Sequence, residues 1–293
     1  MIAYLFPGQG AQYPGMARPL LEQHSNARAV LEQANETLGF DLMETMLNGS
    51  AADLKQTHIT QPAVFVHTIA TWQSMDPDLK PDMVAGHSLG EFSALCAAGA
   101  LPFEGALKLV HLRAQAMQEA CLAVPSTMAA IMGLEDQQVE AVCEDVTGIV
   151  VPANYNAPGQ LVISGEKKAV EHACQKAKEA GAKRAVLLPV GGAFHSPLMD
   201  PARAQLREAI EAIHFSAPVC AVYQNVSATG ETNPQMLKKR LIEQLTAPVR
   251  WHQSVIQMHE DGAHTFTEVG PGKVLQGLVK KIVPGANLKS FGN

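Results

Sequence analysis

The chain has 293 residues, of which 47% are hydrophobic and 17% charged, so it is long enough to bury a large core. Its net charge of −6, without any basic run, argues against nucleic acid as a partner. Five scattered cysteines without a C-x-x-C pair favour a reduced, metal-free, cytoplasmic protein. We also expect no signal peptide and no membrane span, because the first residues lack a basic segment and no apolar run is long enough.

The first 124 residues alternate short apolar strand patterns with longer helical patterns, as in an α/β protein. Thr60 is expected to cap one helix, with Pro62 in its first turn. The predicted elements are a strand over 2–6, a glycine-rich loop over 7–12, helices over 20–38, 61–75 and 104–121, and a strand over 83–85 that leads into a helix over 91–98.

From about residue 124 the elements become shorter and follow the order βαββαβ, which is that of a ferredoxin-like unit. We therefore predict a small domain over 125–190 that is inserted into a larger α/β core formed by 1–124 and 191–293. Within the small domain we expect strands over 127–132, 149–154, 160–164 and 184–190, and helices over 135–145 and 167–180.

After a glycine-rich loop over 191–197, the rest of the chain returns to alternating helices and strands. Here we expect helices over 201–213, 234–245, 252–260 and 274–282, strands over 219–224 and 265–269, and an extended piece over 248–251.

The segment Gly86-His87-Ser88-Leu89-Gly90 has the G-x-S-x-G pattern of a nucleophile elbow. The glycines leave room for a sharp strand-to-helix turn, which raises the serine hydroxyl above the sheet. The free N–H groups at the start of the helix could then bind an oxyanion. Ser88 is thus a candidate nucleophile in an α/β-hydrolase-like core; the alternative is an ordinary turn with a serine cap.

A serine nucleophile needs a base, and His195 has the best placement, in a glycine-rich loop late in the chain. His87 is interpreted as structural, because we expect it to point away from the elbow. Asp200 follows His195 closely, but sequence proximity does not assign it to orient the imidazole, and a backbone carbonyl could do so. The run from His259 to His264 has one residue too many for H-E-x-x-H, so we predict no metal site.

Two further features have open interpretations. The loop Pro7-Gly8-Gln9-Gly10 lacks the third glycine of a dinucleotide fingerprint, so it is either a plain turn or a close backbone approach to a reacting oxygen. Arg113 lies among apolar residues of a predicted helix, where a lone arginine usually extends its charged end to solvent.

Seven motifs occur together and in this order: Phe6–Gly10, Gly86–Glu91, Arg113, Asn154–Gln160, Ala193–Ser196, Pro248–Trp251 and Glu268–Gly272. In this combination, over nearly its whole length, the chain resembles the malonyl-CoA:acyl carrier protein transacylases. It is most similar to the freestanding, trans-acting acyltransferases that serve modular polyketide synthases.

The resemblance implies a role for each matching residue. Ser88 would attack the thioester of malonyl-CoA, and His195 would take its proton and later activate the phosphopantetheine thiol of the carrier. The backbone N–H groups of Gln9 and Leu89 would form the oxyanion hole. Arg113 would hold the malonyl carboxylate by a bidentate pair.

The resemblance also implies a selective pocket. The ring of Phe194 would crowd a substituent on C2 of the acyl group, so methylmalonyl should be disfavoured. His87, Met117 and Asn156 would complete the substrate-binding residues. The backbone carbonyl of Arg250 would orient the catalytic histidine, in place of a triad acid.

The function we predict is malonyl transfer to a holo acyl carrier protein, in trans to a polyketide synthase, by a monomer without a bound cofactor. Fatty-acid-synthesis members usually carry glutamine where this chain has Arg250, so a transacylase of that pathway is the alternative. Other possibilities are an acyl hydrolase of the same fold, whose proofreading members tend to lack the arginine, a silent docking subunit and a serine esterase. An acidic carrier would meet basic side chains of the small domain: Lys167, Lys168, Lys183 and Arg184.

Overall fold

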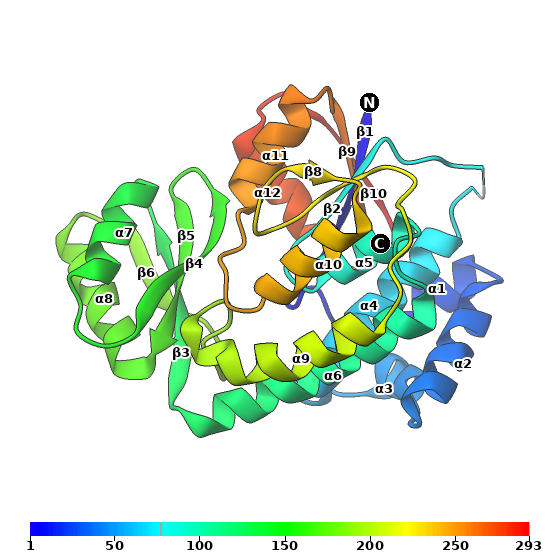
Figure 1. Cartoon of the computed structure of the whole chain (residues 1–293), viewed down its shortest axis with the longest axis horizontal. Coiled ribbons are helices and arrows are strands. Elements are labelled where there is room, and N and C mark those ends of the chain that lie inside the picture. Colours follow the sequence, from blue (N-terminus) through cyan, green and yellow to red (C-terminus); the bar gives the residue numbers. More distant parts are fainter. Residues whose placement is uncertain (77, 293) are drawn as a thin grey trace.

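The computed structural model describes residues 1–76 and 78–292, which form two β-sheets with helices packed on them (Figure 1). The larger sheet has six strands in the order β10-β9-β1-β2-β7-β8. Its strands pair in parallel except β8, which is antiparallel to β7. The strands are β1 (Ile2–Phe6), β2 (Met83–Gly86), β7 (Ala221–Tyr223), β8 (Gly230–Glu231), β9 (Thr265–Val269) and β10 (Asn287–Phe291).

Helices cover both faces of this sheet, and for that reason its central strands are continuous apolar runs. Along β1, Tyr4 and Phe6 belong to the core on one face, while Ala3 and Leu5 belong to the core on the other. The first face is covered mainly by α2 (Ala27–Leu38), α4 (Thr57–Gln73), α5 (Gly90–Ala97) and α6 (Phe103–Ala123), and the second by α11 (Trp251–Glu260) and α12 (Val274–Ile282).

The smaller sheet is antiparallel, in the order β4-β5-β3-β6, and lies at the left in Figure 1. Its chain order is βαββαβ, so the predicted fold class, an α/β core with a ferredoxin-like unit, is confirmed. The domain limits at 124/125 and 190/191 stay a prediction. The elements are β3 (Ser126–Met132), α7 (Asp136–Glu144), β4 (Val150–Ala157), β5 (Gln160–Glu166), α8 (Lys167–Glu179) and β6 (Arg184–Leu187).

The segment before α11 joins the two sheets. The amide of Val249 donates to Ala153 at 2.8 Å, and Tyr155 donates to the carbonyl of Val249 at 2.9 Å, so this segment pairs with β4. On its other side, Arg250 donates to the carbonyl of Asn225, just after β7, at 3.0 Å. The cavity described below is lined from both sides of this junction.

The predicted helix over 20–38 is two helices, α1 (Ala17–Gln23) and α2, because tertiary contacts hold the residues between them. Asn26 donates from its side chain to the carbonyl of Gln73 at 2.7 Å and accepts from Ser74 at 2.8 Å, which fixes it against the end of α4.

The start of α4 also differs from the prediction. This helix begins at Thr57, so Pro62 lies inside it, and Thr60 bonds to the carbonyl of Leu54 instead of capping the helix. The remaining elements are α3 (Leu42–Asn48), α9 (Asp200–Ala212), α10 (Pro234–Glu243) and the short 3-10 turns η1 (Asp53–Lys55) and η2 (Pro197–Met199). Sequence analysis missed α3, β8 and β10, and it drew β6 three residues too long. No helix within the described ranges is long and apolar enough to cross a membrane.

Candidate active site

Ser88 lies in a strained turn between β2 and α5. Its φ is +52°, in the left-handed region that non-glycine residues rarely adopt. The flanking glycines are sterically required: a Cβ on Gly86 would collide with the backbone of Gly90, and a Cβ on Gly90 would collide with the carbonyl of Phe6. The local geometry is therefore that of the predicted elbow.

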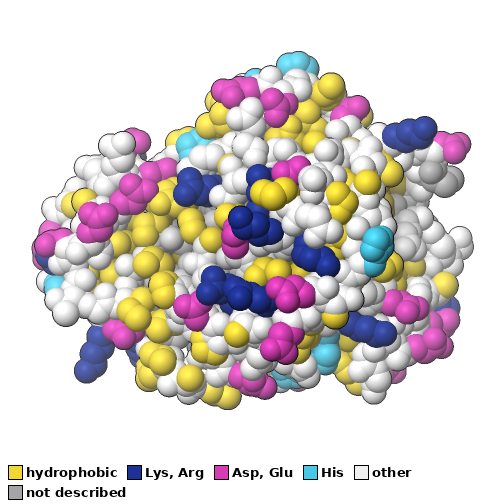
Figure 2. All heavy atoms as spheres, in the orientation of Figure 1, with side chains coloured by type: hydrophobic (Ala, Val, Ile, Leu, Met, Phe, Trp, Pro, Cys, Tyr) yellow, Lys and Arg dark blue, Asp and Glu magenta, His cyan; other side chains and the backbone are white. Residues whose placement is uncertain are grey.

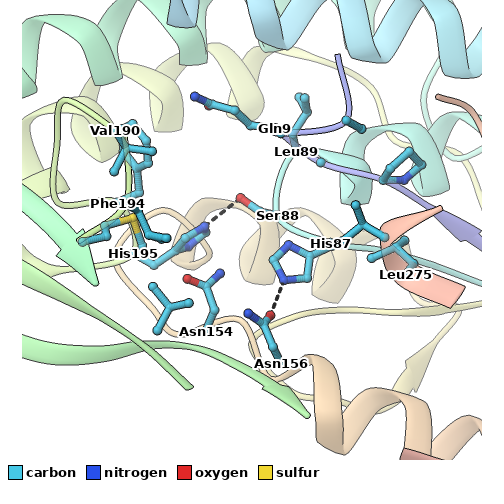
Figure 3. Close-up of a pocket in the computed structure, with 18 of the residues that line it drawn as sticks. Gln9, His87, Ser88, Leu89, Asn154, Asn156, Val190, Phe194, His195 and Leu275 are labelled. Carbon is cyan, nitrogen blue, oxygen red and sulfur yellow. Dashed lines mark hydrogen bonds between the residues drawn. The ribbon is translucent and has the colours of Figure 1, made fainter. Parts of the chain in front are cut away.

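His195 is buried and faces this serine. Its Nε2 lies 2.7 Å from the Oγ of Ser88 (Figure 3), and its Nδ1 lies 3.0 Å from the carbonyl oxygen of Gln244 and 3.2 Å from that of Ala247. Two carbonyls at Nδ1 require the proton there, so Nε2 accepts the hydroxyl proton of the serine. The prediction that Arg250 supplies the orienting carbonyl was wrong, because that carbonyl accepts from Ser254 within α11.

The surroundings of His195 keep it neutral. Burial, assisted by the positive charge of Arg113, lowers the pKa of His195 to about 3, and the two carbonyl contacts only partly oppose this. At neutral pH the imidazole is therefore unprotonated and available as a base.

Arg113 reaches the same serine from α6, and its side chain is only 1% exposed. Its Nη1 donates to Gln61 at 2.8 Å, and its Nη2 donates to the Oγ of Ser88 at 3.0 Å and to Gln244 at 3.4 Å. Burial lowers the pKa of Arg113 to about 10, so it remains charged at neutral pH. Within the described ranges Nε of Arg113 has no partner and no acidic side chain forms an ion pair with it. Its burial excludes the solvent-facing alternative, and the site holds a buried cation suited to a carboxylate.

The loop after β1 and the start of α5 border the nucleophile. The backbone amides of Gln9 and Leu89 make no hydrogen bond inside the part of the chain that the structure covers. Both residues line the cavity beside Ser88 (Figure 3), and Gly10 is held by the side chain of Gln12 at 2.8 Å. Free amides near a nucleophile are the donors that an oxyanion hole requires.

The cavity has a volume of about 320 Å³ and lies between the two sheets. It collects side chains from the core, from the small sheet, from the loop after β6 and from α12. They include Gln9, His87, Ser88, Leu89, Arg113 and Met117; Met128, Asn154, Asn156 and Val162; Leu188, Val190, Phe194 and His195; and Val274, Leu275 and Leu278.

His87 does not point away from the elbow as predicted but lines the cavity (Figure 3). Its Nε2 contacts the side-chain oxygen of Asn156, on β4, at 2.8 Å, and its ring lies 5.5 Å from that of Trp251. Phe194 and Met117, both predicted for the substrate pocket, also line it. The contact between His87 and Asn156 links the elbow to the small sheet.

Four polar residues around the elbow were not predicted to belong to the site: Gln61, Glu91, Asn225 and Gln244. The side chain of Asn225 accepts from the amide of Ser88 and donates to the carbonyl of Gly86, both at 2.7 Å. The buried carboxylate of Glu91 accepts in turn from the amide of Asn225 at 2.7 Å. A charged residue in the apolar helix after the elbow was the signal for Glu91; nothing in the sequence pointed to the other three.

Comparisons with known proteins agree with this geometry. A family model described as "Acyl transferase domain" matches residues 3–290. The malonyl CoA-acyl carrier protein transacylase of Bacillus subtilis is 45% identical over 285 residues, which cover 96% of this chain and 90% of that protein. The crystal structure of an acyl carrier protein S-malonyltransferase from Vibrio cholerae matches with a TM-score of 0.95 at 44% identity and covers 99% of this chain and 96% of that one.

A further match is a malonyl-transacylase solved in complex with a type II polyketide synthase acyl carrier protein. It has a TM-score of 0.93 at 40% identity, and the match covers 99% of this chain and 94% of that one. The identity of 40% or more over nearly the whole length supports the same family as the sequence motifs and the geometry of the elbow. This chain is an acyltransferase and belongs to the malonyl-CoA–acyl carrier protein transacylase family.

Proposed function

We propose that this enzyme transfers a malonyl group from malonyl-CoA to the phosphopantetheine thiol of a holo acyl carrier protein, through a malonyl ester on Ser88. One observation carries the proposal. The Oγ of Ser88 contacts both a neutral histidine, at 2.7 Å, and a buried arginine, at 3.0 Å. The first contact suits general-base activation of the hydroxyl, and the second places a cation where the carboxylate of a malonyl group would lie.

In the acylation step, the Oγ of Ser88 bonds to the thioester carbonyl carbon while its proton passes to Nε2 of His195. The oxygen that becomes negative is held by the amides of Gln9 and Leu89. The bond between carbon and sulfur then breaks, and CoA leaves as a thiol after it takes the proton back from His195.

In the transfer step, His195 takes the proton of the carrier thiol, and the sulfur attacks the ester carbonyl. The bond to the Oγ of Ser88 breaks, and the proton returns from His195 to the serine. Both half-reactions use the same base and the same oxyanion site, so the kinetics should be ping-pong.

The acyl group is selected at its carboxylate and at its central carbon, C2. Its carboxylate would pair with Arg113, whose Nε has no partner in the described ranges, while Phe194 would crowd a substituent on C2. His87, Met117 and Asn156 would form the remaining walls of the acyl site.

For the pathway, we infer supply of malonyl units in trans to a polyketide synthase. This is supported by the resemblance described above and by the similarity to a transacylase solved with a type II polyketide carrier. Fatty-acid synthesis is the alternative. Transfer rates to one polyketide carrier and one fatty-acid carrier separate the two, because the carrier that is served faster at equal concentration indicates the pathway.

For carrier docking, we propose the exposed basic side chains of the small domain: Lys167 and Lys168 at the start of α8, and Lys183 and Arg184 near β6. Figure 2 shows a second group of basic side chains, over the middle of the molecule near α9 and α10. Charge reversal is made in one group at a time. Reversal in the group that binds the carrier should raise the KM for the carrier and leave the rate of acylation by malonyl-CoA unchanged, whereas reversal in the other group should change neither. We also propose that the enzyme is monomeric and cytoplasmic.

The test is the intact mass of the protein after brief incubation with malonyl-CoA, with Ser88→Ala as control. A malonyl adduct that requires Ser88 and passes to added holo carrier supports the transferase. Release of CoA without transfer to the carrier would indicate a hydrolase. Absence of any adduct would remove the enzymatic proposal.

A further inference from the structure

Two buried glutamines flank Arg113, and they differ in what else they contact. Gln61, on α4, accepts from Nη1 of Arg113 at 2.8 Å, and its one other side-chain hydrogen bond within residues 1–76 and 78–292 is donated to the sulfur of Met117 at 3.4 Å. Gln244, directly after α10, accepts from Nη2 of Arg113 at 3.4 Å and also hydrogen-bonds to Ser88 and His195. Their exposures are 0% and 1%, so the pair forms a natural comparison.

Gln244 touches three parts of the site at once. Its side-chain Nε2 donates to the backbone carbonyl of Ser88 at 2.9 Å, its Oε1 faces Arg113, and its backbone carbonyl accepts from Nδ1 of His195 at 3.0 Å. The amide has one satisfactory orientation, because a flip would place a donor against the guanidinium and an acceptor against the carbonyl of the serine.

The backbone of Ser88 needs such support because its φ is +52°. Its carbonyl accepts from the amide of Glu91 at 3.1 Å as well as from Gln244, and its amide donates to Asn225 at 2.7 Å. Of these three supports, Gln244 is the one that also holds the base. Its backbone carbonyl holds His195 together with that of Ala247, while its side chain holds Ser88, so Gln244 bears on both sides of the 2.7 Å contact between the Oγ of Ser88 and Nε2 of His195.

We propose that the side chain of Gln244 is the positioning residue for the Ser88–His195 pair and serves every acyl group, whereas Gln61 positions Arg113 alone and serves only acyl groups with a carboxylate. The inference rests on the proposed function. It assigns Gln244 to the reactivity of Ser88 and Gln61 to the selection of acyl groups. A displacement of about 1 Å between reacting groups costs on the order of 100-fold in rate, so loss of the Gln244 contacts should slow all reactions of Ser88.

The experiment compares Gln244→Met with Gln61→Met, since methionine keeps the length of each side chain and removes its hydrogen bonds. Two probes acylate or sulfonylate Ser88, and the rates are followed by intact mass: malonyl-CoA, and methanesulfonyl fluoride, which has no carboxylate. In the second reaction Oγ bonds to sulfur, fluoride leaves, and His195 takes the proton. We expect Gln244→Met to slow both reactions by about 10-fold to 100-fold. Gln61→Met should slow only the reaction with malonyl-CoA.

Thermal unfolding of both variants monitors the fold, and a third variant keeps the test decisive if Gln244→Met is unstable. Gln244→Glu keeps the shape but places an oxygen against the carbonyl of Ser88, so it should also slow both reactions. The reaction with malonyl-CoA should lose more rate, because the new carboxylate also faces Arg113. The inference would be overturned if Gln244→Met were sulfonylated at the wild-type rate, or if Gln61→Met slowed sulfonylation as much as Gln244→Met does. A wild-type protein that malonyl-CoA does not acylate would instead overturn the proposed function.

Discussion

At the level of single residues, the proposed function assigns the choice of acyl group to Arg113. It is charged, 1% exposed and in no ion pair in the described ranges, although the buried carboxyl of Glu91 lies near enough to raise its pKa slightly. In the proposed function, the malonyl carboxylate would pair with it directly. We expect Arg113→Ala to lower kcat/KM for malonyl-CoA by an amount equivalent to about 2–5 kcal/mol, the usual cost of truncating one partner of a buried charge pair. Acetyl-CoA should lose far less, and Arg113→Lys should recover part of the malonyl rate. Equal losses on the two thioesters would contradict the assignment.

Phe194 is the second residue with a separable effect, because it lines the same cavity next to the base. Phe194→Ala should raise the ratio of kcat/KM for methylmalonyl-CoA to that for malonyl-CoA by about 10-fold to 100-fold, since pocket shape discriminates a methyl group by about 1–3 kcal/mol. Competition between the two thioesters at equal concentration measures the ratio directly. An unchanged ratio would place the steric limit on another residue.

At the scale of elements, the β2–α5 elbow packs so closely on β1 that only glycine fits at its crossing point. Gly90→Ala would force its Cβ into the carbonyl of Phe6, and we expect a loss of about 1–3 kcal/mol in the free energy of unfolding, together with slower acylation. Gly277, inside α12, is the matched control because nothing lies within 4 Å of the position of its Cβ.

Gly277→Ala should therefore stabilise the protein by about 0.5–1 kcal/mol, through helix propensity. Urea unfolding of the two variants and the wild type checks both signs. A stable Gly90→Ala would mean that the elbow can relax away from β1.

At the scale of the whole molecule, stability in acid depends on histidines that the fold keeps neutral. Burial lowers the pKa of His67, on α4, to about 4, from 6.5 for a free histidine. The unfolded chain therefore binds more protons than the folded one between pH 6.5 and 4, so the contribution is complete above pH 6.5 and is lost as the pH falls through 4. Replacing His67 by Gln should remove up to about 3 kcal/mol of this acid-dependent loss.

The measurement is urea unfolding at several pH values between 7 and 4, with the exposed His214→Gln as control. The His67→Gln variant should show a flatter dependence of the unfolding free energy on pH, whereas the control should follow the wild type. Parallel curves for all three proteins would show that other groups dominate acid stability.

The fold class and the elbow followed from the sequence alone, which also predicted Ser88 and His195 as the reacting pair. Those features depend on local rules: apolar periodicity specifies strands and helices, and G-x-S-x-G specifies a turn whose crowding admits only glycine at two positions. A resemblance across seven motifs then assigned roles to Ser88, His195 and Arg113. The errors at this level, such as the unbroken helix over 20–38, arose where a side chain such as Asn26 bonds to a distant segment.

The contacts that hold the site come from the tertiary structure. The carbonyls that orient His195 belong to Gln244 and Ala247 and not to Arg250, and Asn225 fixes the amide of Ser88 from 137 positions away. Such contacts leave no periodic or motif signal, because a buried amide can come from any segment that the fold brings near. They follow from packing β2, β7 and the loop after α10 against one another, which the order of residues alone does not specify.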